Sequence, residues 1–137
     1  MNINTIFSPQ AIQEALEILR DEIPFALLET LYITIVSTIF AFIIGLPLGV
    51  LLVVGEKKGI LPLPAAFMKI INAVIDIIRS VPFLILMIVV FPLTALIVGT
   101  RVGTTASIVP LVISAFPFIA RLVESSLREV NPNIIEA

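Results

Sequence analysis

Cysteine, histidine and tryptophan are all absent from the 137 residues. Without cysteine there are no disulfides or thiolate metal ligands, and without histidine there are no imidazole ligands and no histidine-activated nucleophiles. Charged residues are also scarce, at 13% of the chain against roughly one-quarter in soluble domains. The basic residues are dispersed and the net charge is −2. The basic surface that binds nucleic acid is therefore excluded as well.

Long apolar stretches make up most of the remaining sequence. Hydrophobic residues account for 59% of the chain, and its mean hydropathy is +1.19. Three stretches carry no charged residue, at 30–55, 80–100 and 102–120. A helix needs about 20 mainly apolar residues to cross a hydrocarbon core roughly 30 Å thick. We therefore predict an all-α, polytopic transmembrane protein with spans at about these three positions.

The first 29 residues are more polar, and we treat 1–29 as an N-terminal segment that precedes a membrane domain at 30–137. Ser8 and Pro9 can supply an N-cap and a first-turn proline. Apolar residues then recur at helical spacing, at Ile12, Leu16, Leu19 and Ile23. Because Pro24 follows, we expect an amphipathic helix that ends there and lies flat in the headgroup layer. An ordinary soluble cap is the alternative.

Two weaker patterns lie on either side of the connection that follows the first apolar stretch, 30–55. Gly45 and Gly49 are spaced for close approach of another helix, although this spacing is common by chance. After the connection, polar residues recur every three or four positions, at Lys69, Asn72, Asp76 and Arg79. This spacing places the four side chains on one helix face, with Asp76 and Arg79 close enough to pair. A solvated interfacial face is the plainer alternative.

Proline and serine interrupt the third apolar stretch. Pro110 and Pro117 lie two turns apart and free carbonyls on nearly the same helix face. A membrane tolerates this where other helices or a water-filled cavity satisfy the backbone. We therefore expect Pro110, Ser114 and Pro117 to line a translocation pathway, as the broken helices of transporters do. A kinked helix in a purely structural bundle is the alternative.

Charged residues return directly after the third stretch. Arg121, Glu124 and Arg128 are spaced three and four positions apart, which suits pairing on one helix face. They form a candidate charge cluster that orders the cytoplasmic end of this span. The alternative is that the arginines snorkel toward the headgroups and the turn is solvated.

The distribution of basic residues predicts the orientation. Six of the eight Lys and Arg residues flank the first connection or follow the third span, namely Lys57, Lys58, Lys69, Arg79, Arg121 and Arg128. Arg20 and Arg101 lie on the other side. Basic residues are enriched in cytoplasmic loops. We therefore expect a bacterial cytoplasmic-membrane protein with its N-terminus outside and the end of this sequence inside.

The apolar spans hold none of the groups that an enzyme needs. They contain no paired carboxylates, no metal-ligand motif and no nucleophile next to a base. No glycine is followed by the Lys-Ser or Lys-Thr pair that a phosphate-binding loop requires. We therefore assign no catalytic residue, no metal site and no cofactor to this chain. If ATP drives the protein, another subunit binds it.

Several segments taken together resemble a known family. They are RSVPF at 79–83, PLT at 92–94, IVGT at 97–100, ASIVPL at 106–111 and AFPFIARLVE at 115–124. The set closely resembles the permease subunit of methionine ABC importers, and the resemblance extends from about residue 45 to the last residue. Each segment alone is a weak signal, whereas the combination is specific.

The resemblance implies a permease subunit that imports D- or L-methionine or a related amino acid. Members of the family form a homodimer with five spans in each chain. The dimer engages two cytoplasmic ATPase subunits that hold ATP and Mg, and it receives substrate from an extracytoplasmic binding lipoprotein. The resemblance also implies that Glu136 and Ala137 begin the coupling helix that docks on the ATPase. The sequence ends at this point, so we interpret it as the front part of a longer permease.

Two other classes of membrane protein stay open on the sequence alone. A small holin-like pore-forming protein also has few spans and a charged tail, and a membrane adaptor merely recruits a soluble partner. The continuation after Ala137 separates these classes. A coupling helix and two further spans favour the importer, whereas a native stop codon favours the pore.

Overall fold

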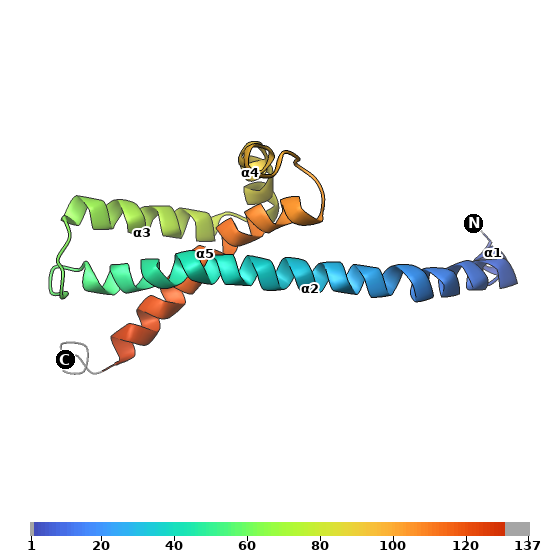
Figure 1. The fold of residues 1–137 in the computed structure, drawn as a ribbon, viewed down its shortest axis with the longest axis horizontal. Coiled ribbons are helices and arrows are strands. Elements are labelled where there is room, and N and C mark those ends of the chain that lie inside the picture. Colours follow the sequence, from blue (N-terminus) through green and yellow to red (C-terminus); the bar gives the residue numbers. More distant parts are fainter. Residues whose placement is uncertain (1, 131–137) are drawn as a thin grey trace.

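The computed structural model describes residues 2–130, and all regular secondary structure in that range is helical. The helices are α1 (Ile3–Ile6), α2 (Pro9–Val54), α3 (Ala65–Ser80), α4 (Phe83–Val98) and α5 (Thr104–Glu129). Figure 1 shows that α3, α4 and α5 gather around the C-terminal half of α2. The N-terminal half of α2 extends away from them, with α1 at its far end. The fold is thus the all-α arrangement that the composition predicts.

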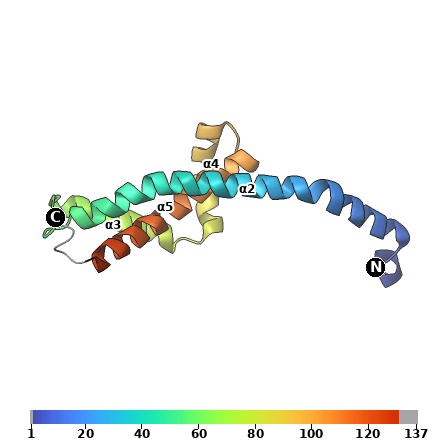
Figure 2. The same ribbon diagram turned by 60° about the horizontal axis from the view of Figure 1, so that its bottom comes forward.

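Helix α2 begins where the sequence predicts and continues beyond the predicted end. Ser8 is the N-cap and its hydroxyl accepts a hydrogen bond from the amide of Ala11 at 3.2 Å, with Pro9 in the first turn. The predicted break at Pro24 is wrong, because one helix of 46 residues runs from Pro9 to Val54. A proline removes one backbone hydrogen bond, but the remaining bonds on both sides hold the helix together. In Figure 2 the helix curves gently and stays continuous.

The length of α2 shows that only part of it lies in hydrocarbon. Its 46 residues span about 69 Å at 1.5 Å per residue, more than twice the roughly 30 Å of a hydrocarbon core. Every residue from 12 to 28 is exposed. The uncharged stretch starts at Thr30. The charged first part of α2 therefore projects beyond the core as a direct continuation of the span.

The region of the predicted second span contains a sharp bend. The helix axis bends by 116° between α3 and α4, across a break at residues 81–82. Val81 adopts an extended conformation, with φ −79° and ψ 128°, because the ring of Pro82 disfavours the helical region for the residue before it. Two helices, α2 and α5, are each long and apolar enough to cross a membrane, and a third span results if α3 and α4 together count as one.

Helix α5 follows a turn bounded by Gly99 and Gly103. Gly99 and Gly103 have φ angles of 87° and 121°, a region that side chains with a Cβ rarely adopt. The helix then continues to Glu129, more than two turns past the predicted span end at Ala120. The extra turns carry the charged residues of the candidate site.

Helices α2 and α5 form the main packing contact of the fold (Figure 1). A Cβ atom added to Gly49 would lie 2.6 Å from the carbonyl oxygen of Ala120 and 2.6 Å from the Cβ of Val123. One added to Gly45 would lie 2.8 Å from the Cβ of Ile119. The glycine pair that is only a weak signal in the sequence therefore lies in close contact with α5.

An apolar core joins α2, α3 and α5 near the C-terminal end of α2. Its buried members are Leu52, Met68, Ile75 and Ala120, with Leu48, Leu63 and Ile71 packed against them. Because one side of α3 packs on this core, the polar stripe of α3 is held next to the last turns of α5. This packing brings together the side chains of the candidate functional site.

Candidate functional site

The three charged residues that the sequence singles out contact one another on the last turns of α5. Arg121 Nη1 donates to Glu124 Oε2 at 2.7 Å, and Arg128 Nη2 donates to Glu124 Oε1 at 2.6 Å. Each oxygen of Glu124 therefore accepts from a different arginine. These are the contacts that the spacing of three and four residues predicts.

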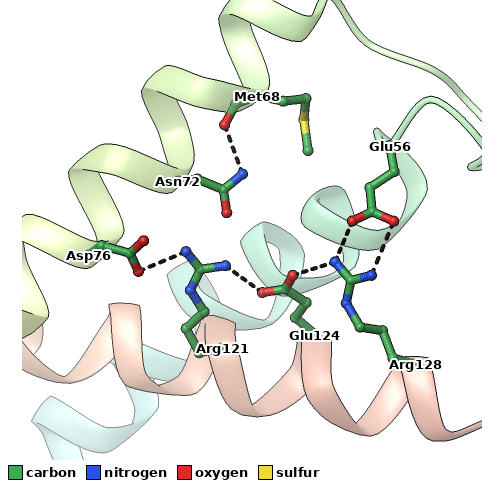
Figure 3. Close-up of polar contacts among 7 residues, drawn as sticks. All are labelled: Glu56, Met68, Asn72, Asp76, Arg121, Glu124 and Arg128. Carbon is green, nitrogen blue, oxygen red and sulfur yellow. Dashed lines mark hydrogen bonds and ion pairs between the residues drawn. The ribbon is translucent and has the colours of Figure 1, made fainter.

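Two further carboxylates extend this row of charges to other parts of the chain (Figure 3). Arg121 Nη2 donates to Asp76 Oδ1 of α3 at 2.8 Å. The guanidinium of Arg128 donates to both oxygens of Glu56, which follows α2, with one of the two distances at 3.1 Å. We call these five residues, Glu56, Asp76, Arg121, Glu124 and Arg128, the charged cluster. It connects the end of α2 with α3 and α5.

The partner of Asp76 corrects a prediction. The sequence places Arg79 within reach on the same helix face, but Asp76 pairs with Arg121 of α5 instead. A side-chain pair between two packed helices joins elements that are 45 residues apart, whereas a pair within α3 would only support that helix. Asp76 is thus both solvated, with its side chain 59% exposed, and paired with Arg121.

Burial is uneven along the charged cluster. Glu124 is 8% exposed, whereas the side chains of Asp76 and Glu56 are 59% and 44% exposed. A buried carboxylate needs opposite charges and hydrogen bonds to offset its lost hydration. Arg121 and Arg128 supply both, and each guanidinium reaches outward to a second, more exposed carboxylate. Glu124 is therefore the centre of the cluster.

Sequence reasoning missed Glu56 as a member of the cluster and gave Asp76 the wrong partner. The position of Glu56 and Asp76 at the boundaries of apolar stretches is a signal that could have identified both as partners of the arginines. Glu56 is the first charged residue after the first apolar stretch, and Asp76 lies on the polar stripe that precedes the second. Charged residues at the same membrane boundary are close in depth, so they are natural partners for the arginines that follow the third stretch. Their pairing in three dimensions still depends on how α3 packs.

The residues predicted to line a pathway lie on the inner part of α5. Pro110 and Pro117 are buried within this chain, and Ser114 is half-buried. The hydroxyl of Ser114 donates to the carbonyl of Leu111 at 2.9 Å, which satisfies it within its own helix. Their role in lining a pathway stays a prediction.

Two of the predicted site residues, Glu136 and Ala137, lie outside the described residues. The described part of α5 ends at Glu129, and Val130 has an extended backbone with φ −72° and ψ 138°. The prediction that a coupling helix begins at Glu136 therefore stays a prediction.

A separate polar contact joins α2 and α5 at the opposite end of α5. Thr104, the first residue of α5, donates its hydroxyl to Glu29 Oε1 at 2.8 Å. Both side chains are half-buried. A carboxylate next to the first turn of a helix is also favoured by the helix dipole. Within residues 2–130, no three His, Cys, Asp or Glu side chains gather in a way that could hold a metal ion.

The chain is similar to known transport proteins over most of its length. It is 50% identical over 112 residues to the probable D-methionine transport system permease protein MetI of Vibrio cholerae, covering 80% of this chain and 48% of that protein. It is 48% identical over 109 residues to the D-methionine transport system permease protein MetI of Escherichia coli K12, covering 80% of this chain and 50% of that protein. No protein-family model matches the sequence.

A solved structure agrees with these relatives. The chain superposes on a chain from the inward-facing MetNI methionine ABC transporter with a TM-score of 0.74 and 47% sequence identity, covering 79% of this chain and 50% of that one. A second crystal form of the same transporter gives a TM-score of 0.73. This chain spans about half the length of the relatives it matches. It is thus a homologue of the methionine ABC transporter permeases over about four-fifths of its own length, as its sequence motifs indicate.

Proposed function

We propose that this chain is part of a permease that imports methionine, as the D or L isomer, or a related amino acid across the bacterial cytoplasmic membrane. Two copies form the translocation pathway, and two cytoplasmic ATPase subunits engage them. A binding lipoprotein on the outer side delivers the substrate. The chain itself is not an enzyme, because ATP and Mg are held by the partner subunits.

One observation carries this proposal. Near 50% identity over four-fifths of the chain coincides with the same arrangement of helices as in a methionine ABC transporter. No comparison supports the small pore-forming protein or the membrane adaptor, and we set both aside.

The orientation is part of the proposal. The basic residues of the α2–α3 connection and of α3 lie at the same end of the fold as the charged turns of α5. The positive-inside rule places this end in the cytoplasm. The N-terminal part of α2 and the turn with Arg101 then face outward. Residues 1–29 form an outer segment, and 30–137 form part of the membrane domain.

The charged cluster supplies the mechanical part of the proposal. It joins the end of α2, α3 and the last turns of α5, and Glu136 and Ala137 follow α5 in the sequence. Because the cluster holds these helices rigidly together, a movement of the ATPase against the coupling helix is transmitted to the membrane helices. Pro110, Ser114 and Pro117 face the pathway higher in the same helix.

The experiment measures import and assembly together. The full-length permease, expressed with its ATPase and binding protein in a strain that lacks methionine importers, should restore uptake of labelled methionine. It should also co-purify with the ATPase from detergent. Replacing Glu136 with Lys should weaken this co-purification, because the change reverses a charge where the coupling helix is expected to begin.

A matched control uses an acidic residue on the described part of the same region. Glu129→Lys makes the same charge change on α5 before the expected coupling helix, and it should leave the ATPase bound. Recovery of intact permease without any ATPase would contradict the proposal. Restored uptake of another amino acid in place of methionine would contradict its substrate alone.

A further inference from the structure

A cavity of about 290 Å³ lies where α2 ends and α3 begins, beside the charged cluster. Its apolar wall includes Leu63 and Met68. Its polar lining includes Lys57, Lys69 and Asn72. The volume is at the small end of the range of ligand pockets. The cavity therefore suits a compact polar group next to an apolar one.

The charges that line this cavity leave it positive. Glu56 contributes the one carboxylate of the lining, and both of its oxygens accept hydrogen bonds from Arg128. Within residues 2–130, neither Lys57 nor Lys69 forms an ion pair. One N–H of the Asn72 amide donates to the carbonyl of Met68 at 2.8 Å, and the group keeps a second N–H. Two lysines and an asparagine thus contribute to a mainly apolar lining that holds no free carboxylate.

The position of the cavity along α2 narrows the choice of ligand. The uncharged part of α2 ends at Gly55, which lines the cavity together with Lys57. This is the depth at which a transmembrane helix leaves the hydrocarbon and meets the lipid phosphates. The neighbouring connection also exposes Ile60 and Leu61, at 61% and 64%. Exposed apolar side chains next to lysines are suited to the boundary between acyl chains and headgroups.

We infer that this cavity binds the phosphate headgroup of an anionic phospholipid. Lys57 and Lys69 contact the phosphate, Asn72 donates to a headgroup oxygen, and the acyl chains continue along the apolar surface beside Leu61. Basic pockets at this level of a membrane protein bind anionic headgroups in this manner. The inference rests on the membrane placement in the proposed function, but it does not depend on the transported substrate.

The test measures lipid binding to the full-length permease in a neutral detergent by native mass spectrometry. Phosphatidylglycerol should bind, and phosphatidylcholine of the same chain length should bind much more weakly. Each lysine near an anionic lipid surface contributes about a five-fold factor in affinity. The K57Q/K69Q variant should therefore bind phosphatidylglycerol about 25-fold more weakly. K57R/K69R keeps both charges and should bind within about two-fold of the wild type.

Lys58 provides the matched control. It neighbours Lys57 and is exposed, but it does not line the cavity, so K58Q should leave binding unchanged. An equal loss in K58Q and K57Q would overturn the inference, since it would indicate general attraction to a basic loop. Displacement of the lipid by millimolar inorganic phosphate would also overturn it, in favour of a soluble anion. Methionine uptake, measured separately, tests the proposed function whatever the lipid result.

Discussion

At the scale of single residues, Glu124 is the side chain on which the charged cluster depends. It is 8% exposed, and both of its oxygens accept hydrogen bonds from arginines. The outer members, Asp76 and Glu56, can regain water if a contact is lost, because they are half-exposed. Glu124 cannot. Loss of its charge would leave two guanidinium groups facing a neutral amide in a partly buried place.

The first prediction concerns this charge. Glu124→Gln keeps the size of the side chain and removes its charge, so it should lower the free energy of unfolding by about 3 kcal/mol, the low end for breaking a buried ion pair. The low end applies because Asp76 and Glu56 still engage the arginines. Thermal unfolding of the detergent-solubilised protein measures the change. Glu129→Gln, an exposed site on the same helix, should have almost no effect, and equal losses in the two variants would contradict the central role of Glu124.

A second residue-scale prediction concerns the contact between Thr104 and Glu29. Thr104→Val keeps the shape of the side chain and removes the hydroxyl that donates to Glu29 Oε1. It should lower the free energy of unfolding by about 1.5–3 kcal/mol, the range for a hydrogen bond to a charged group. Thr105→Val is the matched control, because Thr105 is the exposed neighbour.

A double-mutant cycle tests whether this contact is direct. When Glu29→Gln is combined with Thr104→Val, the loss should be smaller than the sum of the two single losses. Additive losses would show that the two side chains act independently, which the contact at 2.8 Å does not allow.

At the scale of helices, the close contact of α2 with α5 depends on the lack of side chains at Gly45 and Gly49. The added Cβ at Gly49 would meet a backbone oxygen, which cannot move aside as the tip of a flexible side chain can. The two helices would have to separate. Since α2 and α5 make the largest helix contact of the described chain, such a separation would also disturb the alignment of the charged cluster.

The third prediction follows from this contact. Gly49→Val should lower the free energy of unfolding by at least the upper end of the ~1–3 kcal/mol typical of overpacking. It should also weaken the contact of Arg128 with Glu56, because the distance between α2 and α5 grows. Unfolding measurements in detergent test the first effect. Val50→Leu adds bulk at the next residue, which faces outward, and a comparable loss there would contradict the packing argument.

Glycine and proline residues made some helix boundaries predictable from the sequence. The glycines at 99 and 103 require backbone angles that few other residues adopt, so the turn before α5 is visible in the sequence. Pro82 likewise marks the break between α3 and α4. Pro24 is the counterexample: α2 continues through it, because the helical bonds on both sides outweigh the one that the ring removes. A proline alone therefore does not decide where a membrane-associated helix ends.

At the scale of the whole molecule, the absence of cysteine from these 137 residues makes the orientation directly testable. Lys58→Cys and Arg101→Cys place single thiols at opposite ends of the fold. In intact cells, a membrane-impermeant maleimide should label the Arg101 variant and should label the Lys58 variant only after permeabilisation. The reverse pattern would place the charged cluster outside and would contradict the proposed coupling to cytoplasmic ATPase subunits.

The class of protein is visible in the sequence because it depends on local composition. Long uncharged apolar stretches indicate transmembrane helices, and the basic residues beside them indicate orientation, whichever helix faces pack together. The pairing of Arg121, Glu124 and Arg128 is local as well, since all three lie within two turns of one helix. The motifs that resemble methionine permeases are likewise short and contiguous.

The tertiary structure alone decided the features that join distant parts of the chain. The approach of Gly45 and Gly49 to α5, the pairing of Asp76 with Arg121 and of Glu56 with Arg128, and the burial of Glu124 all depend on which helix faces meet. Many faces of these helices are similarly apolar, so hydrophobic pattern does not select among them. Close steric fit and the need to pair buried charge select the faces that meet. Both act only once the helices are side by side.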